Sequence, residues 1–420
     1  MDDPPCHAAF PPAPSGSGID KESGGVMDYD VVVVGGGPAG LAFARGLARA
    51  SQRGRPLKVA IVERQPREAL AQPAFDGREI ALTHRSIDTL KALGAWEHIP
   101  QNEVAPLREA RVLNGASPFA LAFDPRGGVH DRLGTLVPNH LIRRALFEVT
   151  ARQEGLDLLT GASITALGAD DSGAHVVLAD GRRLAAPLLV GADSRFSFVR
   201  EQLGIPAQIN RTGRSMLCCR VHHEADHGNI ATEWFDHGET KAILPLNGRM
   251  ASAVLTLASE EIDRLCAMDP ATLGAELTRR FDGRLGQMRV AQAPHAYPLA
   301  TTWSRHFAST SAALIGDAAV GMHPVTAHGF NLGLRSAASL AALVVRAHGL
   351  GRPLASPLLL RRYEAGQRLA ARPLYDGTNL LVNLFTAETP PARLARSASL
   401  RLAARLPGLR GGVSRLLLQR

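Results

Sequence analysis

The chain has 420 residues, of which 45% are hydrophobic and 20% are charged, and its mean hydropathy is −0.02. This composition predicts a soluble globular protein long enough for two domains, and it excludes a fibrous or wholly disordered chain. The formal charge of +8 is concentrated in residues 389–420, where seven arginines and no acid give +7 and leave +1 for the rest. Because no aromatic residues stand among those arginines, nucleic-acid binding is not expected.

The sequence also shows no signal for secretion, membrane spanning or metal binding. The longest uncharged apolar stretch, residues 31–44, falls short of the roughly 20 residues that span a bilayer. Four cysteines have no C-x-x-C spacing, and the adjacent His222 and His223 would face opposite sides of a strand. We therefore expect a cytoplasmic protein without disulfides and without a metal site.

The N-terminal third begins with a segment of low complexity. Residues 1–26 are rich in Pro, Gly and Ser and are predicted to be disordered, so Met27 is the expected natural start. A strand at 29–35, a helix at 38–52 and a strand at 57–63 then form a βαβ unit.

The remaining elements follow in an order that mixes helices with antiparallel strands. Helices are expected at 85–95, 138–153, 270–281 and 331–347. Strands are expected at 110–114, 118–124, 287–299 and 312–316, with β-rich material up to 191 and alternating strands over 214–257. The C-terminal region is predicted to be helical with breaks at Pro373, Pro390 and Pro407.

This order predicts an α/β protein: a Rossmann-like dinucleotide-binding domain with an inserted antiparallel β-sheet substrate domain and a helical C-terminal region. The nucleotide-binding domain would comprise 27–109, 135–205 and 300–350. The substrate domain would comprise an excursion at 110–134 and the main segment 206–299, and the helical region with its basic tail would be 351–420.

The strongest motif is the sequence VVVVGGGPAG over 31–40. Gly35 would allow the tight turn, Gly37 would let a pyrophosphate approach the backbone, and Gly40 would let the following helix pack on the strand. The helix N-terminus offers free N–H groups to phosphates, and Glu63 could accept hydrogen bonds from ribose hydroxyls. A purely structural glycine turn is the alternative, and this motif alone leaves NAD or FAD open.

Two later segments resemble those of flavoprotein aromatic hydroxylases. The sequence LLVGADSRFSFVR over 188–200 resembles their G-A-D-G-x-x-S-x-V-R segment, and AALIGDAAVGMHPVTAHGFNLGL over 312–334 resembles their G-D-A-A-H-x-x-x-P-x-x-G-Q-G-x-N-x-G segment. With the first motif, they are similar to the class A flavin monooxygenases, the para-hydroxybenzoate hydroxylase superfamily, over about 28–400. The resemblance implies that the dinucleotide is FAD.

Within that superfamily, FDGREIALTHRS over 75–86 and NLLVNLF over 379–385 followed by PPARL resemble the ubiquinone-biosynthesis hydroxylases (the UbiH/UbiF/Coq6 group), most closely the UbiM subfamily. The resemblance implies a polyprenylated phenol or quinol substrate, flavin reduction by NAD(P)H, and hydroxylation by O2 through a flavin C4a-hydroperoxide. The alternatives are the same fold acting on a soluble aromatic compound or as a prenyl reductase, and a non-catalytic flavin-binding subunit.

The resemblance also assigns roles to single residues. Asp317 would hold the ribityl chain of the flavin while Gly316 allows its approach, and Asp193 would contact the cofactor. Arg78 would neutralise the pyrophosphate, and Arg64, beside Glu63, joins the same cofactor-binding set.

A loop and the helix after it would form the ring end of the flavin site. The loop from Pro324 to Gly329 would pass the isoalloxazine, and the helix beginning near Asn331 would aim its positive end at the N1–C2=O edge. His323 and His328 flank this loop, and one of them could orient or deprotonate a phenol. The alternative is that both are polar loop residues beside the cofactor.

Several positions depart from the family pattern. Ser194 replaces the usual Gly, Val320 the usual His, and Ser336 a common Asp. Ala327 and His328 replace Gly-Gln, and Ala327 is compatible with the family loop only if its φ is negative.

The tail alternates arginines with leucine and alanine at broadly helical spacing. It is either a solvated helix face or an interfacial segment attracted to anionic lipid, which would suit a substrate that lives in the bilayer. The expectation is a cytoplasmic enzyme, with peripheral contact at the inner face of the membrane and membership of a quinone-biosynthesis complex as open alternatives.

Overall fold

The computed structural model describes residues 26–50, 56–115, 120–123, 131–236, 238–324 and 328–386. The predicted leader lies outside these residues except for Val26, which begins strand β1 (Val26–Asp28) and pairs with Arg183, so the prediction of disorder is wrong at this residue. The basic tail, with the breaks predicted at Pro390 and Pro407, also lies outside them.

A six-stranded sheet contains the predicted βαβ unit. Strand β2 (Val31–Val34) pairs in parallel with β3 (Val59–Glu63) on one side and with β13 (Leu188–Gly191) on the other, and α1 (Pro38–Ala50) connects β2 to β3. The four valines of β2 are between 0% and 6% exposed, as expected for a parallel strand covered on both faces. The sheet is completed by β9 (Leu156–Thr160), β21 (Ala312–Leu314) and the short antiparallel edge strand β20 (Ala308–Ser309).

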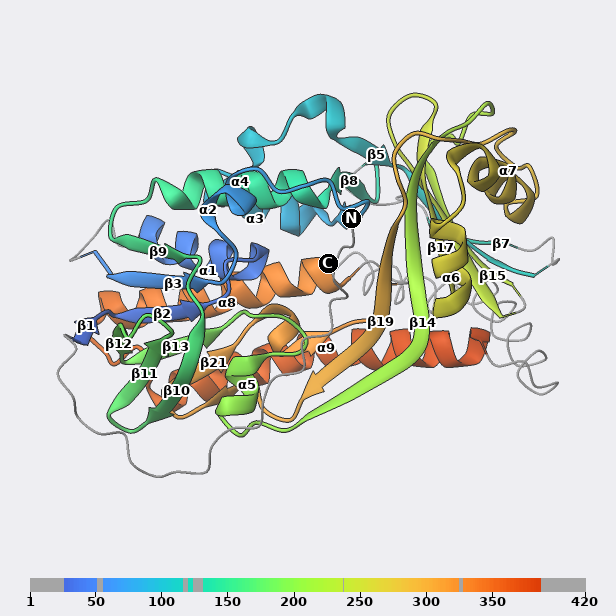
Figure 1. Ribbon diagram of the computed structural model, residues 1–420. Coiled ribbons are helices and arrows are strands. Elements are labelled where there is room, and N and C mark those ends of the chain that lie inside the picture. Colours follow the sequence, from blue (N-terminus) through green and yellow to red (C-terminus); the bar gives the residue numbers. More distant parts are fainter. Residues whose placement is uncertain are drawn as a thin grey trace.

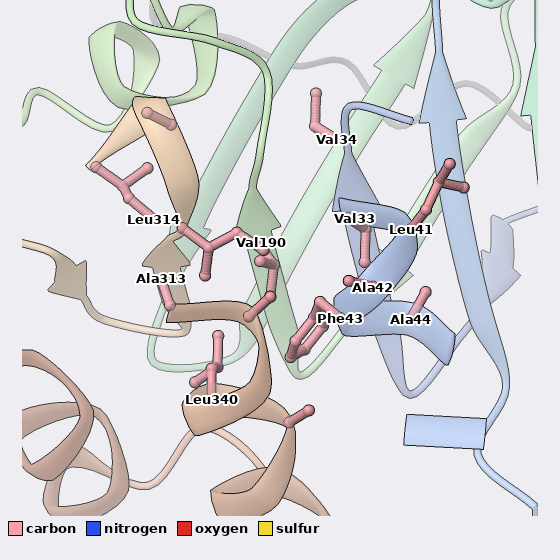
Figure 2. Close-up of a cluster of buried hydrophobic side chains, with 14 of the residues drawn as sticks. Val33, Val34, Leu41, Ala42, Phe43, Ala44, Val190, Ala313, Leu314 and Leu340 are labelled. Carbon is pink, nitrogen blue, oxygen red and sulfur yellow. The ribbon is translucent and has the colours of Figure 1, made fainter. Parts of the chain in front are cut away.

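Helices pack on this sheet and form the main core. Figure 2 shows Leu41 and Phe43 of α1 in one cluster with Val33 of β2, Val190 of β13 and Leu340 of α8. Helix α8 (Gly329–Gly349) packs along α1, which also contacts α4 (Asn139–Ala151) and α3 (His84–Leu93). Thr83 caps the N-terminus of α3, because its hydroxyl oxygen accepts from the Ser86 N–H.

Two smaller sheets lie beside this core. One contains β1, β12 (Arg183–Ala186), β11 (Gly173–Leu178) and β10 (Ile164–Asp170), and the other contains β4 (Glu79–Leu82), β8 (Gly134–Pro138) and β5 (Ala105–Leu107). Short helices α2 (Arg67–Ala71) and α5 (Phe198–Gln202) complete this part of the molecule.

A nine-stranded sheet forms the other body of the molecule (Figure 1). The alternation predicted over 214–257 becomes four antiparallel strands: β14 (Ala207–His222), β15 (Ile230–Asp236), β16 (Glu239–Pro245) and β17 (Met250–Ala258). Strands β6 (Glu109–Asn114) and β7 (Ala120–Phe123) extend one edge; β19 (His295–Ser304) and β22 (Val320–Gly321) extend the other, and β18 (Arg289–Val290) pairs with β14.

The two faces of the large sheet have different neighbours. Helices α6 (Ser259–Cys266) and α7 (Pro270–Arg280) cover the face that carries Leu217 and Cys219, and together they form a second core. Cys218 and Arg220 point to the opposite face, because side chains alternate along a strand. The long strands β14 and β19 run side by side toward the six-stranded sheet (Figure 1).

The break predicted at Pro373 is wrong, because α9 runs from Pro357 to Thr386 through this residue. A proline inside a helix releases the carbonyl four residues earlier, which here belongs to Leu369. Leu369 is 80% exposed, so water can satisfy that carbonyl. The side chains of Leu374 and Tyr375 are buried and stabilise the continuation of the helix beyond the proline.

Candidate functional site

The glycines of the first motif shape a turn whose backbone is open to a ligand. Gly35 has φ +110°, and an added Cβ there would collide with the carbonyl of Ala192. A Cβ at Gly40 would collide with the carbonyl of Gly35, so α1 can approach the strand only with glycine here. A Cβ at Gly37 would meet nothing within 4 Å. The first turn of α1 therefore has an uncovered backbone side, as a bound pyrophosphate requires.

Glu63 fixes the end of this turn from the neighbouring strand. Its Oε2 accepts from the N–H of Gly36 at 2.6 Å, and its Oε1 accepts from the N–H of Gln65 at 2.8 Å. Arg64 lies exposed between them. The carboxylate is thus held beside the glycine turn, and its contact with a ribose stays a prediction.

The second motif forms a strained turn between β13 and α5. Both carboxylate oxygens of Asp193 have partners within the turn: Ser197 Oγ donates to Oδ1 at 2.5 Å and the Val199 N–H donates to Oδ2 at 3.0 Å. Burial raises the pKa of Asp193. Ser194 has φ 103°, which strains any residue but glycine, so the departure from the family glycine has a structural cost. Asp193 shapes this turn, and its cofactor contact stays a prediction.

The third motif meets the second through an ion pair. Asp317 lies in the single turn η4 (Gly316–Ala318), and its Oδ2 is 3.1 Å from Nη2 of Arg195. Arg195 also donates from Nη1 to the carbonyl of Ala300 on β19 at 3.1 Å. Ser336, at the position of the common Asp, accepts from the Gly316 N–H at 2.9 Å. Sequence reasoning missed Arg195, although it stands inside the quoted segment, because its partner is 122 residues away.

Asn331 fixes the start of α8 against the segment before α3. Its Oδ1 accepts from the Thr83 N–H at 3.1 Å, and its Nδ2 donates to the Ala81 carbonyl at 2.8 Å. Helix α8 begins at Gly329, two residues before the predicted start. Pro324 ends the described part of the preceding loop, and Ala327 lies outside the described residues.

Both candidate histidines are buried beside this loop, with His323 7% and His328 6% exposed. Burial, together with the charges of Arg214 and Arg195, lowers the pKa of His323 to about 4. His323 is therefore neutral at physiological pH and can accept a hydrogen bond.

Arg78 forms side-chain contacts where residues 75–79 pack against the large sheet. Its Nη2 is 2.6 Å from Oδ2 of Asp76, and its guanidinium lies 5.0 Å from the ring centroid of Tyr297. Beside it, Arg220 of β14 forms a buried ion pair of 2.7 Å with Glu79. Residues 75–79 are thus clamped on the sheet face that α6 and α7 leave uncovered, and a pyrophosphate contact of Arg78 stays a prediction.

Neither a metal site nor a membrane span is found in the part of the chain that the structure describes. No group of three or more His, Cys, Asp or Glu side chains could hold a metal ion there. None of the described helices is long and apolar enough to cross a bilayer.

The three motifs lie against one another, since Gly35 approaches Ala192 and Arg195 pairs with Asp317. The family model for the FAD binding domain matches residues 28–378. The chain therefore belongs to the FAD-binding family of class A flavin monooxygenases, and the expected cofactor is confirmed.

The relatives identify the branch of that family as the ubiquinone hydroxylases. The ubiquinone hydroxylase UbiM of Neisseria meningitidis is 43% identical over 395 residues, covering 93% of this chain and 85% of the relative. The ubiquinone hydroxylase UbiL of Rhodospirillum rubrum is 35% identical over 367 residues, covering 87% and 84%. Among solved structures, the anhydrotetracycline hydroxylase OxyS of Streptomyces rimosus superimposes with a TM-score of 0.70 at 23% identity over 94% of this chain and 76% of that one. That likeness supports the fold alone.

Proposed function

We propose that this protein is an FAD-dependent monooxygenase that hydroxylates the aromatic ring of a polyprenylated phenol intermediate of ubiquinone biosynthesis, with NAD(P)H and O2 as co-substrates. The observation that carries the proposal is the 43% identity to a ubiquinone hydroxylase over 93% of the chain. The convergence of the three motifs supports the FAD dependence of this reaction, because Gly35 approaches Ala192 and Arg195 pairs with Asp317.

The residues present fit FAD at the places where each part of the cofactor would lie. The open backbone at Gly37 and the first turn of α1 would hold the pyrophosphate. Asp317 would accept from a ribityl hydroxyl, and Arg195 would orient its carboxylate through their ion pair. When bound, FAD supplies the redox chemistry that activates O2.

The start of α8 would stabilise negative charge at the ring edge. The free N–H groups and the dipole of a helix N-terminus favour an anion. Asn331 holds this helix end in place through its two hydrogen bonds to residues 81 and 83. The positive end of α8 therefore requires no rearrangement before it can act.

His323 is a candidate for orienting the phenol. A neutral imidazole accepts a hydrogen bond from a phenol hydroxyl, and a pKa near 4 makes it a weak base. We propose that His323 positions the hydroxyl group rather than carrying its proton away. His328 remains the second candidate on the other side of the loop.

Complementation of a bacterial strain that lacks a single quinone hydroxylase tests the proposed function. The gene should restore the missing quinone, and mass spectrometry should show the accumulated phenol disappear. An unchanged accumulation in each of the available hydroxylase-deficient strains, despite FAD-loaded protein in the cells, would contradict the proposal.

We further propose peripheral contact with anionic membranes. Helix α9 leads into the basic tail, and its exposed leucines recur every 11 residues, which places them on one helix face: Leu358, Leu369 and Leu380. Exposed Arg361 and Arg362 lie near that face.

Replacing Arg401, Arg405, Arg410 and Arg415 with Gln should reduce co-sedimentation with anionic liposomes at low salt, with FAD content unchanged. Equal sedimentation of the variant and the wild type would leave the tail a solvated segment.

A further inference from the structure

A polar cleft of about 250 Å³ lies between α3 and α8, and of its lining residues Asn331 alone belongs to one of the three nucleotide motifs. The polar side chains that line the cleft come from both helices: Arg85, Ser86 and Thr89 from α3, and Asn331, Arg335 and Ser339 from α8. The small residues Ala338 and Ala342 complete its wall and leave room for a ligand.

The two arginines of this cleft have no carboxylate partner within the described ranges. In contrast, Arg195, Arg220 and Arg280 each face an acid. Burial, and next the charge of Arg85, lower the pKa of Arg335. A guanidinium stays protonated in proteins, so two positive charges face this cleft, one on exposed Arg85 and one on half-buried Arg335. A bound anion would lower their mutual repulsion.

The rest of the cleft suits an anion with several oxygen atoms. Arg85 and Ser86 stand in the first turn of α3, where the helix dipole favours negative charge. Ser339 adds a hydroxyl group, whereas the hydroxyl of Thr89 donates to the Arg85 carbonyl at 2.9 Å. A guanidinium fork matches two oxygens of a phosphate, so this donor set is suited to a phosphate group.

The cleft is separate from the turn that would hold the flavin pyrophosphate. Arg335, Ala338 and Ala342 recur at helical spacing and share one face of α8. Ala341 lies on another face, with its Cβ 3.1 Å from the place of an added Cβ at Gly46 of α1. Helix α1 and the cleft therefore contact different sides of α8.

We propose that the cleft between α3 and α8 is a binding site for a phosphate group of a small ligand, other than the phosphates of FAD. Two sources carry this group: a nicotinamide dinucleotide and a phospholipid headgroup. The choice of the dinucleotide as a probe rests on the proposed function, but the site itself does not.

The test measures binding to the full-length, FAD-loaded protein by isothermal titration calorimetry. Inorganic phosphate is the first probe. Arg85→Gln and Arg335→Gln should each weaken phosphate binding about tenfold or more, as expected for a lost charge-assisted contact. Arg346→Gln, exposed farther along α8, is the matched control and should bind as the wild type does. The visible spectrum of FAD and the melting temperature should not change in any of the three.

Further probes identify the source of the phosphate. If the variants raise the Kd of NADPH but not that of NADH, the group is the 2′-phosphate; if both rise, it is the pyrophosphate. If only binding to vesicles containing phosphatidylglycerol weakens, the source is lipid. Each outcome supports the site and needs no quinone substrate, so a failed complementation would not affect it. The proposal is overturned if phosphate, both dinucleotides and these vesicles bind the Arg85→Gln/Arg335→Gln double variant as tightly as the wild type.

Discussion

At the scale of single residues, Asp317 is the side chain on which the cofactor assignment depends most. Asp317→Ala removes a charged acceptor that we expect to bind a ribityl hydroxyl, a contact worth roughly 1.5–3 kcal/mol or about ten- to a hundredfold in affinity. FAD retention after gel filtration, read from the visible spectrum, should fall accordingly, while circular dichroism stays that of the wild type.

Two variants separate this contact from the ion pair with Arg195. Asp317→Asn keeps an acceptor oxygen and should retain more FAD than the alanine variant. Arg195→Gln breaks the 3.1 Å pair but leaves the carboxylate, so its loss should be smaller. Full FAD occupancy in Asp317→Ala would show that the third motif does not bind the cofactor as proposed.

Ser194 offers a test of backbone strain. Its φ of 103° costs a non-glycine residue on the order of 1–3 kcal/mol, whereas glycine adopts it freely at a smaller entropic cost. Ser194→Gly should therefore stabilise the protein by about 1 kcal/mol in denaturant unfolding. Asn229→Gly is the control, because asparagine already tolerates φ 58° there. A lower midpoint for Ser194→Gly would mean that the serine side chain stabilises the turn.

His323 predicts a pH dependence of stability. Its pKa is about 4 in the folded protein against an ordinary 6.5, so the unfolded chain takes up the proton first as the pH falls. Stability linked to this group is present above pH 6.5 and is lost between pH 6.5 and 4, by up to about 3 kcal/mol. The wild type should lose about 2 kcal/mol more than His323→Gln between pH 7 and pH 4.5. Parallel losses in the two proteins would mean that His323 titrates normally in the fold.

At the scale of secondary-structure elements, Pro373 within α9 gives a local prediction. A proline inside a helix costs about 3 kcal/mol relative to alanine, and Pro373 is exposed, so no packing compensates. Pro373→Ala should raise the melting temperature without changing FAD content. The matched change Pro353→Ala, in the connection before α9, should not. No difference between them would indicate that α9 already accommodates the proline without strain.

Local signals explain which elements could be predicted from the sequence. The βαβ unit follows from four buried valines and the glycine spacing, and α8 from its apolar periodicity. The start of β14 at Ala207 was not predictable, because residues 208–213 are exposed and mostly polar, and residues 207–211 are ordered by pairing with β19. The strand predicted over 287–299 became two strands, β18 and β19.

The candidate site was predictable where a motif is contiguous and not where it depends on distant partners. Gly35 and Gly40 lie where the spacing required, since a close approach of backbone atoms excludes any side chain. Arg78 was assigned to the pyrophosphate, but Asp76 two residues earlier competes for its guanidinium. The pairs Arg195–Asp317 and Arg220–Glu79 span 122 and 141 residues, and no local pattern announces them.

At the scale of the whole molecule, the six-stranded sheet and the large nine-stranded sheet have different roles in the proposed reaction. The six-stranded sheet carries the three motifs, of which the glycine turn is the first. The large sheet presents the face opposite α6 and α7 to residues 75–79. Strands β19 and β22 belong to the large sheet. The predicted boundary at residue 300 had assigned the residues beyond it to the nucleotide-binding domain. The domain limits therefore stay a proposal.

The most direct test of ring hydroxylation follows labelled oxygen into product. FAD-loaded protein would be incubated with NAD(P)H, ¹⁸O2 and a short-chain prenylated phenol, and the product would be analysed by mass spectrometry. The account predicts a hydroxylated ring that carries one ¹⁸O atom, with NAD(P)H consumption stimulated by the phenol. Hydroxylated product whose new oxygen comes from water, or NAD(P)H oxidation that yields only hydrogen peroxide with every prenylated phenol tried, would contradict it.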